Sequence, residues 1–460
     1  MDDLADLLRH AASTAAGFRA GLSERAVRPD ADLAALRGAF GGPLPREGAA
    51  PRAVVDELIR AAEPGLTASA GPRFFGFVIG GALPAATAAD MLAAGWDQCA
   101  FNAVLSPAAA AAEECAGRWL KDLLCIPAAA SIGFVTGGQE ANTVGLAAAR
   151  HYVLVEAGWD VERDGLIGAP AVRVVVGEER HATVDRSLRL LGLGTAQVEP
   201  VPTDANGAIR VDDLDRVLAH RGGPLIVSLQ AGNVNTGACD DLRTACDVVH
   251  RHGGWAHVDG AFGLWAAANP ATAHLVDGIE LADSWSCDGH KWLNVPYDSG
   301  FSFCARPDVH VAAVSHAAPY LTGSGGATAV MGDSVLSASR RARGFAVWVA
   351  LRQLGADGVA ALVERCCGLA RRFADRLTEG GLEIVNEVVL NQVLVGFEPA
   401  VDDAHVDRVV EAVQREGTCW LGATTWRGRR LMRISVSNHA TTDTDIDRSA
   451  EAIVRVAARA

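Results

Sequence analysis

The stretch Asp283-Ser-Trp-Ser-Cys-Asp-Gly-His-Lys-Trp-Leu-Asn-Val-Pro-Tyr-Asp-Ser-Gly300 sets one lysine, Lys291, between a histidine and a tryptophan, directly after a short strand-like run. Lysine is strongly hydrated, so an apolar, turn-rich neighbourhood indicates that its amine is used. A desolvated lysine has a lowered pKa and becomes a nucleophile toward carbonyl carbons. The alternative is a surface lysine beside a partly buried Trp292. The rest of the chain decides between these two interpretations.

Size and composition narrow the class of protein. A chain of 460 residues, half of them hydrophobic, predicts one large domain with smaller appendages. A net charge of −14 argues against nucleic acid or an anionic membrane as a partner. The chain has no visible secretory leader and no membrane-length apolar span free of charges or Gly/Pro, and its ten cysteines form no C-x-x-C pair. We expect a cytoplasmic protein with reduced cysteines and no metal site.

The order of strand-like and helix-like runs predicts the domain organisation. We expect an N-terminal helical segment at 1–82, a large domain at 83–347 and a small α/β domain at 348–460. From about residue 130 the alternation favours a mainly parallel sheet with helices on both faces. Strands are expected at 172–176, 197–201, 225–229, 255–258, 281–286, 391–397 and 431–436, and helices at 183–191, 212–220, 241–252, 359–378, 404–416 and from 444. Glycine and small polar residues at Thr322–Thr328 predict a mobile loop.

The segment Phe134–Asn142 predicts an anion-binding turn. It reads as a strand that ends in Gly137-Gly138 and opens a helix. Free backbone N–H groups and the positive end of the helix dipole attract phosphate at such a place. Two glycines also occur in ordinary strand-to-helix turns, so this segment gains weight only beside the others.

Two more polar residues follow strand-like runs. His181 comes after strand 172–176, at the sheet edge where open α/β folds bind ligands, and its ring could stack on an aromatic cofactor or cap a helix. Asp259 ends the apolar strand before Gly-Ala261, where it could keep a pyridine nitrogen protonated or form a turn. A phosphate cradle, a stacking histidine, an acidic partner and a reactive lysine in this order predict a pyridoxal 5'-phosphate site.

With these residues in hand, the chain resembles the group II pyridoxal-phosphate-dependent decarboxylases over roughly residues 70–355. The resemblance implies the aspartate aminotransferase fold (fold type I), with a seven-stranded sheet and active sites at the interface of a homodimer. It also implies decarboxylation of an L-amino acid to the amine, starting from a Schiff base between the cofactor and Lys291. The residues that it implies at the cofactor are Gly138, Gln139, His181, Asn233, Asp259, Ala261, His290 and Lys291.

Tyr320 matches the tyrosine of the family's catalytic loop, and the resemblance implies that it protonates the substrate carbon after CO2 leaves. The alternative is an ordinary loop aromatic. Asp288 departs from the Asn-Pro of animal decarboxylases and is similar to the branch that contains sphingosine-phosphate lyase, which cleaves C–C bonds. Because a carboxylate repels phosphate, we expect Asp288 to point away from the cradle.

A second reaction on the same cofactor stays open. Arg433 lies where a small-domain arginine could clamp a substrate carboxylate, as in aminotransferases; the slightly favoured alternative is an ion pair with Asp443 or Asp445. Transamination or aldolase-like C–C cleavage is therefore the alternative to decarboxylation. A protein that binds the cofactor without turnover is the third possibility, and the set Lys291, Asp259 and His181 argues against it.

Overall fold

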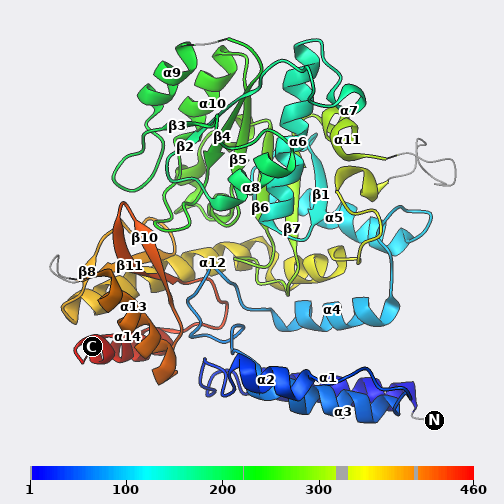
Figure 1. The fold of residues 1–460 in the computed structure, drawn as a ribbon, viewed down its shortest axis with the longest axis vertical. Coiled ribbons are helices and arrows are strands. Elements are labelled where there is room, and N and C mark those ends of the chain that lie inside the picture. The colour runs from blue at the N-terminus through cyan, green and yellow to red at the C-terminus, as the bar shows by residue number, and fades with distance from the viewer. Residues whose placement is uncertain (1–2, 221, 317–329, 398–401, 460) are drawn as a thin grey trace.

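The computed structural model describes residues 3–220, 222–316, 330–397 and 402–459, and its centre is a seven-stranded sheet (Figure 1). The strand order is β1-β7-β6-β5-β4-β2-β3, with β7 antiparallel to both neighbours and the other pairs parallel. This confirms the predicted α/β fold with a mainly parallel sheet. The strands are β1 (Ser131–Val135), β2 (Arg173–Gly177), β3 (Glu199–Val201), β4 (Leu225–Gln230), β5 (Trp255–Asp259), β6 (Ser284–Asp288) and β7 (Gly300–Cys304).

Helices cover both faces of this sheet because alternate strand residues point to opposite sides. Val174 and Val176 of β2 pack with α6, α8 and α11, whereas Val175 between them belongs to the larger core on the other face. Every residue of β4 except Gln230 is buried, as a strand covered twice requires. The helices around the sheet are α5 (Pro107–Leu123), α6 (Gly138–Glu156), α7 (Val161–Asp164), α8 (Ala182–Leu190), α9 (Val211–Ala219), α10 (Leu242–Arg251) and α11 (Pro307–Val314).

A second, four-stranded antiparallel sheet of order β10-β11-β9-β8 forms the C-terminal part of the protein. Its own core includes Phe373, Val393 and Ile434. Strands β9 and β11 confirm the predicted strands 391–397 and 431–436, while β8 and β10 were not predicted. The elements are β8 (Glu383–Ile384), β9 (Gln392–Gly396), α13 (Asp403–Glu416), β10 (Gly422–Trp426), β11 (Arg429–Ser435) and α14 (Asp443–Ala457).

Helix α12 (Gly344–Glu379) joins the two parts. Its buried residues up to Cys367 pack in the large core, and those from Leu369 onward pack in the small core. The change from one core to the other therefore lies about twenty residues after the predicted domain boundary at 347/348. By length and apolar composition α12 is the one described helix that could span a membrane, but it supplies buried residues to both cores, which a core helix also does.

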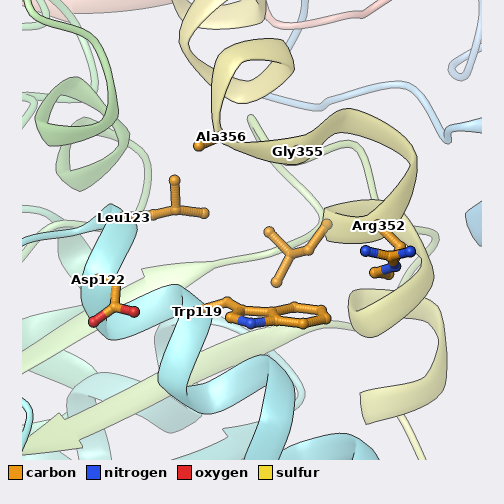
Figure 2. A pocket seen from close by; sticks show the side chains of 7 residues that line it. Trp119, Asp122, Leu123, Arg352, Gly355 and Ala356 are labelled. Carbon is orange, nitrogen blue, oxygen red and sulfur yellow. The ribbon is translucent and has the colours of Figure 1, made fainter.

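The backbone of α12 departs from helical geometry at Gly355, with φ 63° and ψ 178°. A cavity of about 450 Å³ opens there between α12 and α5, with the ring of Trp119 as its floor (Figure 2). Its lining residues belong to α5 and to the two sides of this break, and the sequence analysis assigned none of them to the cofactor site.

The N-terminal helices form a layer that stands apart from the sheet (Figure 1). They are α1 (Leu4–Ala20), α2 (Leu33–Phe40) and α3 (Pro51–Ala62), and α4 (Pro84–Trp96) follows. Between the layers, segment 71–83 contributes Phe75 to the small core and Val78 and Leu83 to the large one. The predicted residues Tyr320 and Thr322–Thr328 lie outside the described part of the chain.

Candidate active site

The turn from β1 into α6 forms an anion cradle. The backbone N–H of Gly138 donates a hydrogen bond to Asp288 Oδ1 at 2.5 Å. A Cβ added to Gly137 would lie 2.7 Å from the His290 ring, and one on Gly138 would lie 3.0 Å from Asp288 Oδ2. Glycine is therefore required at Gly137, where a side chain would strike the histidine ring, and a Cβ on Gly138 would crowd the anion. The predicted Gly-Gly turn into a helix is present, and a carboxylate oxygen accepts one of its N–H groups. Phosphate binding at this turn stays a prediction.

Lys291 lies just past the end of β6, and its Nζ is 2.9 Å from Asp288 Oδ2. Two predictions are therefore wrong. The amine is not in purely apolar surroundings, because a carboxylate that is only 1 % exposed faces it. Asp288 does not point away from the cradle, because β6 ends at Asp288 and directs its side chain toward the start of α6. Repulsion between like charges does not arise in this structure, since the groups that meet the carboxylate are an N–H and an ammonium.

His290 lies beside the same turn, and its predicted contact with a cofactor stays a prediction. Its Nδ1 accepts a hydrogen bond from the backbone N–H of Ser299 at 3.2 Å, so the ring proton is assigned to Nε2, which lies 3.5 Å from Asp288 Oδ1. Tyr297 stacks on the ring with the centroids 4.2 Å apart. Burial lowers the pKa of His290, so a neutral imidazole faces the cradle.

Asp259 is the last residue of β5 and is 4 % exposed. Its Oδ2 accepts a hydrogen bond from Asn142 Nδ2 at 3.1 Å. Its Oδ1 accepts from Ser286 Oγ and from the backbone N–H of Ala261, both at 3.3 Å. All three contacts are made by donors, so both oxygens of this carboxylate act as acceptors.

A chain of buried hydrogen bonds stands behind Asp259. Trp255 Nε1 donates to Ser284 Oγ at 2.9 Å, and Ser284 Oγ lies 2.8 Å from His257 Nδ1. His257 Nε2 lies 2.9 Å from Asn142 Oδ1, while the amide of Asn142 donates to Asp259. Since burial lowers the pKa of His257 to about 4, the ring is neutral, and every bond can point the same way, toward the carboxylate.

Asn142 and His257 were not predicted to have a role in the site. Both lie in segments that carry predicted site residues: Asn142 follows the Gly-Gly turn, and His257 lies two residues before Asp259. The available signal was a polar side chain within an otherwise apolar buried strand, which needs a buried partner. The partner could not be identified, because it lies 115 residues away in the chain.

His181 follows β2 and is the N-cap of α8: the backbone N–H of Thr183 donates to its Nδ1 at 3.2 Å. The prediction that His181 caps a helix is therefore confirmed, and the cap uses its Nδ1. Because Nδ1 accepts, the proton of the neutral ring is assigned to Nε2. Burial lowers the pKa of His181; the charge of Asp259 opposes this, and Lys291 lowers the pKa further. The imidazole is thus held in one orientation within electrostatic reach of both predicted partners.

Three other predicted residues surround these groups. The side chain of Gln139 donates to Ser187 Oγ at 2.9 Å and so ties α6 to α8. Asn233 donates to the backbone oxygen of Glu179 at 2.9 Å and to Gln230 Oε1 at 3.0 Å, so both of its amide hydrogens hold a turn. Ala261 lies between the two carboxylates, since its oxygen accepts from the N–H of Asp288. Contact of these residues with a cofactor stays a prediction.

Arg433, on β11, does not pair with Asp443 or Asp445. Asp445 caps α14 through Thr442 and lies 3.4 Å from Arg73 instead. Arg433 contacts the oxygen of Val234 at 3.5 Å and makes no ion pair with a carboxylate in the described ranges. Burial lowers its pKa, and it is close enough to His181 for its charge to lower the pKa of that ring. The favoured alternative was wrong because Asp445 has other partners.

These groups meet at the carboxyl ends of the parallel strands, where α/β folds bind ligands. Gly138 follows β1 and His181 follows β2, while Asp259 is the last residue of β5 and Lys291 follows β6. The set fits pyridoxal 5'-phosphate: a turn whose N–H already binds a carboxylate, an amine beside it, a carboxylate held by three donors and an oriented imidazole. The fold and the site thus define a pyridoxal-phosphate enzyme of fold type I.

Comparison with known proteins agrees with this class. Residues 43–398 match the family model described as the pyridoxal-dependent decarboxylase conserved domain. Tryptophan decarboxylase 1 of Oryza sativa subsp. japonica is 26 % identical over 95 % of this chain and 90 % of its own length. Aspartate 1-decarboxylase of Aliivibrio fischeri is 29 % identical over 58 % of this chain and 51 % of its own.

The crystal structure of Oryza sativa TDC with PLP and tryptamine has a TM-score of 0.92 at 24 % identity, over 100 % of this chain and 98 % of that one, which supports the fold. The chain belongs to the pyridoxal-dependent decarboxylase family, since the family model matches most of its length. It is a pyridoxal-phosphate-dependent amino acid decarboxylase, as the sequence predicted.

Proposed function

We propose that this enzyme removes the α-carboxylate of an L-amino acid, with Lys291 as the residue that binds the cofactor aldehyde. The observation that carries the proposal is the meeting of Lys291, Gly138 and Asp259 at one edge of the sheet. Bound pyridoxal phosphate supplies an electron sink for the electron pair left by departing CO2. The residues of the chain have to hold the ring, keep its nitrogen protonated and deliver a proton to the substrate.

Asp259 is the proposed partner of the pyridine nitrogen. A carboxylate fixed by three donors cannot turn away, and its remaining lone pairs can accept the N–H of a protonated ring. The neutral chain of Asn142 and His257 behind it brings no cation that would compete for this charge. The network therefore favours the cationic ring on which the chemistry depends.

His181 and Tyr320 are the proposed proton donors at the substrate carbon. His181 presents an Nε2–H, because its Nδ1 accepts from Thr183. The role of Tyr320 rests on the resemblance alone, since it lies outside the described residues. A Tyr320→Phe variant tests it: loss of amine formation with intact cofactor binding supports a donor, and unchanged amine formation assigns the step to His181.

Arg433 supports a carboxylate-binding role. A partly buried guanidinium without a carboxylate partner in the described part of the chain keeps its full capacity to bind an anion. A substrate carboxylate close to His181 would satisfy it. The same observation keeps transamination as the second candidate function, since an arginine that holds the α-carboxylate hinders its departure.

We further propose a homodimer in the cytoplasm. Apolar side chains on α1 to α3 face solvent, among them Leu4 at 67 %, Leu33 at 61 % and Phe40 at 57 % exposure. A groove of about 680 Å³ between α4, α5 and α12 has an almost wholly apolar lining, including Leu92, Trp96 and Trp348. Apolar surface on this scale favours a partner copy. Light scattering should give twice the chain mass of 47.9 kDa; a monomer would contradict the dimer.

The test of the function is a screen of the purified protein, loaded with cofactor, against the twenty amino acids. CO2 release with an amine identified by mass supports decarboxylation. A keto acid that forms only when an acceptor is present supports the second candidate. Lys291→Ala should abolish either activity, while Lys121→Ala, on α5, is the control for loss of a lysine elsewhere.

A further inference from the structure

Asp288 occupies the place where the cofactor's phosphate group is expected. We propose that Asp288 competes with this phosphate for the cradle at the start of α6, and so sets how strongly the enzyme prefers a phosphorylated cofactor over the free aldehyde. The inference rests on the proposed roles of Gly138 and Lys291. It goes beyond them because it assigns a function to Asp288, the residue that departs from the Asn-Pro pattern of animal decarboxylases.

The two oxygens of Asp288 hold both groups that the cofactor needs. Oδ1 accepts from the N–H of Gly138 at 2.5 Å, and that N–H is a phosphate donor of the cradle. Oδ2 lies 2.9 Å from Nζ of Lys291, the amine that reacts with the aldehyde. The carboxylate therefore bridges the cradle and the amine, and the cofactor has to take both contacts from it.

The backbone of Asp288 cannot withdraw the side chain. Its N–H donates to the oxygen of Ala261 at 2.9 Å, and its oxygen accepts from Trp265 Nε1 at 3.1 Å. Across the sheet it pairs with Gly300 of β7, where an added Cβ would lie 2.5 Å from the Cα of Gly137. Only rotation of the side chain can release the cradle. If it does not rotate, the phosphate lies beside a carboxylate with 1 % exposure, where water screens little.

Within the described ranges, the other titratable groups that face Asp288 do not supply a second cation. Burial lowers the pKa of His290, whose Nε2 is 3.5 Å away, and that of His181. Burial, helped by the charge of Asp288, raises the pKa of Tyr297 to about 12, so its phenol is neutral as well. Lys291 is then the balancing charge. When the cofactor aldehyde engages this amine, the carboxylate and the phosphate are two anions at one set of donors.

The test compares cofactor binding by the full chain and by its Asp288→Asn variant, after removal of cofactor. Dissociation constants for pyridoxal 5'-phosphate and for pyridoxal are measured by absorbance and fluorescence titration. Asn keeps the shape of the side chain and loses the charge, so the preference for the phosphorylated form should rise at least tenfold. Inorganic phosphate should raise the melting temperature of the variant more than that of the wild type.

Asp298→Asn is the matched control. It removes a carboxylate from the same segment, but this one pairs with Arg343 at 2.7 Å and does not reach Gly138. Its preference for the phosphorylated form should stay within twofold of the wild type. If Asp288→Asn does not fold, Asp288→Ser serves, since it also removes the charge.

Two results would overturn the proposal, and they differ in whether the proposed function also fails. If the phosphorylated cofactor attaches at Lys291 but its preference over pyridoxal is unchanged or lower in Asp288→Asn, competition at the cradle is wrong and the proposed function stands. If neither aldehyde attaches at Lys291 in the wild-type protein, the proposed function fails together with the competition.

Discussion

Two buried carboxylates stand at the ends of the neighbouring strands β5 and β6, and they are held in opposite ways. Asp259 is fixed by neutral donors, with a chain of neutral side chains behind it. Asp288 is held by the ammonium of Lys291 and by a backbone N–H at a helix start. The first set of contacts can remain when the cofactor binds, whereas both contacts of the second set are ones that the cofactor itself would make.

Replacing each carboxylate by its amide tests this difference with the largest expected effects. Asp259→Asn should lower kcat at least a hundredfold, about 2.7 kcal/mol in the activation barrier, because a neutral amide does not keep the pyridine nitrogen protonated. Asp288→Asn should instead tighten cofactor binding. The check is kcat beside cofactor affinity for both variants; a similar loss of kcat in the two would remove the distinction between them.

The support behind Asp259 should matter next. Asn142→Ala leaves Asp259 Oδ2 and His257 Nε2 without partners in a buried place, which costs about 1–3 kcal/mol each. We expect kcat to fall by roughly ten- to a hundredfold, with a shifted absorbance of the bound cofactor. Asn391→Ala, at a buried asparagine of the small domain, should lose stability only. An Asn142→Ala enzyme with wild-type kcat would show that Asp259 needs no support.

The low pKa of His257 makes the contribution of this hydrogen-bond chain to folding stability depend on pH. The folded value is about 4, below the ordinary value of 6.5, so between these values the unfolded chain binds a proton that the folded protein does not. The contribution of a neutral His257 is complete above pH 6.5 and is lost as the pH falls through 4, by about 3 kcal/mol at the limit. In urea unfolding, the destabilisation caused by His257→Gln should shrink over this range; a difference constant from pH 7 to 4.5 would contradict it.

Crowding the His257 ring tests the same hydrogen-bond chain, with the smallest expected effect of these variants on stability. A Cβ on Gly145 would lie 2.6 Å from the His257 ring, so Gly145→Ala should push the ring and cost about 1–3 kcal/mol of unfolding free energy. Gly368→Ala, in α12, meets nothing within 4 Å and should be neutral or stabilising by about 0.5–1 kcal/mol. Thermal unfolding of the two variants decides; equal changes would mean that the ring is loosely packed.

The sequence was sufficient for the strands and for the edge at which the site lies. Runs of valine and isoleucine at 172–176 and 225–229 predict buried strands from composition alone. His181, Asp259 and Lys291 could be placed together because each follows such a run. Strand β7 was missed, although its alternating Gly-Phe-Ser-Phe-Cys begins at Gly300, the last residue of the quoted stretch. The sequence of one strand does not show that it runs antiparallel between two others.

Interactions between distant residues could not be predicted. The bond from Asn142 to Asp259 spans 117 positions, and the contact of Gly138 with Asp288 spans 150. Which polar atoms meet depends on strand register and on the exact start of α6. The expectation that Asp288 points away from the cradle considered only its repulsion by a phosphate. It left out the ammonium of Lys291, which attracts the carboxylate toward the cradle.

The most direct test of the account is to find the lysine that carries the cofactor. The purified enzyme, loaded with pyridoxal 5'-phosphate, is reduced with borohydride and digested, and the modified peptide is sequenced by mass spectrometry. We expect one reduced adduct per chain, on Lys291. An adduct on another lysine, or a cofactor that leaves the protein unmodified, would contradict the assignment of the site.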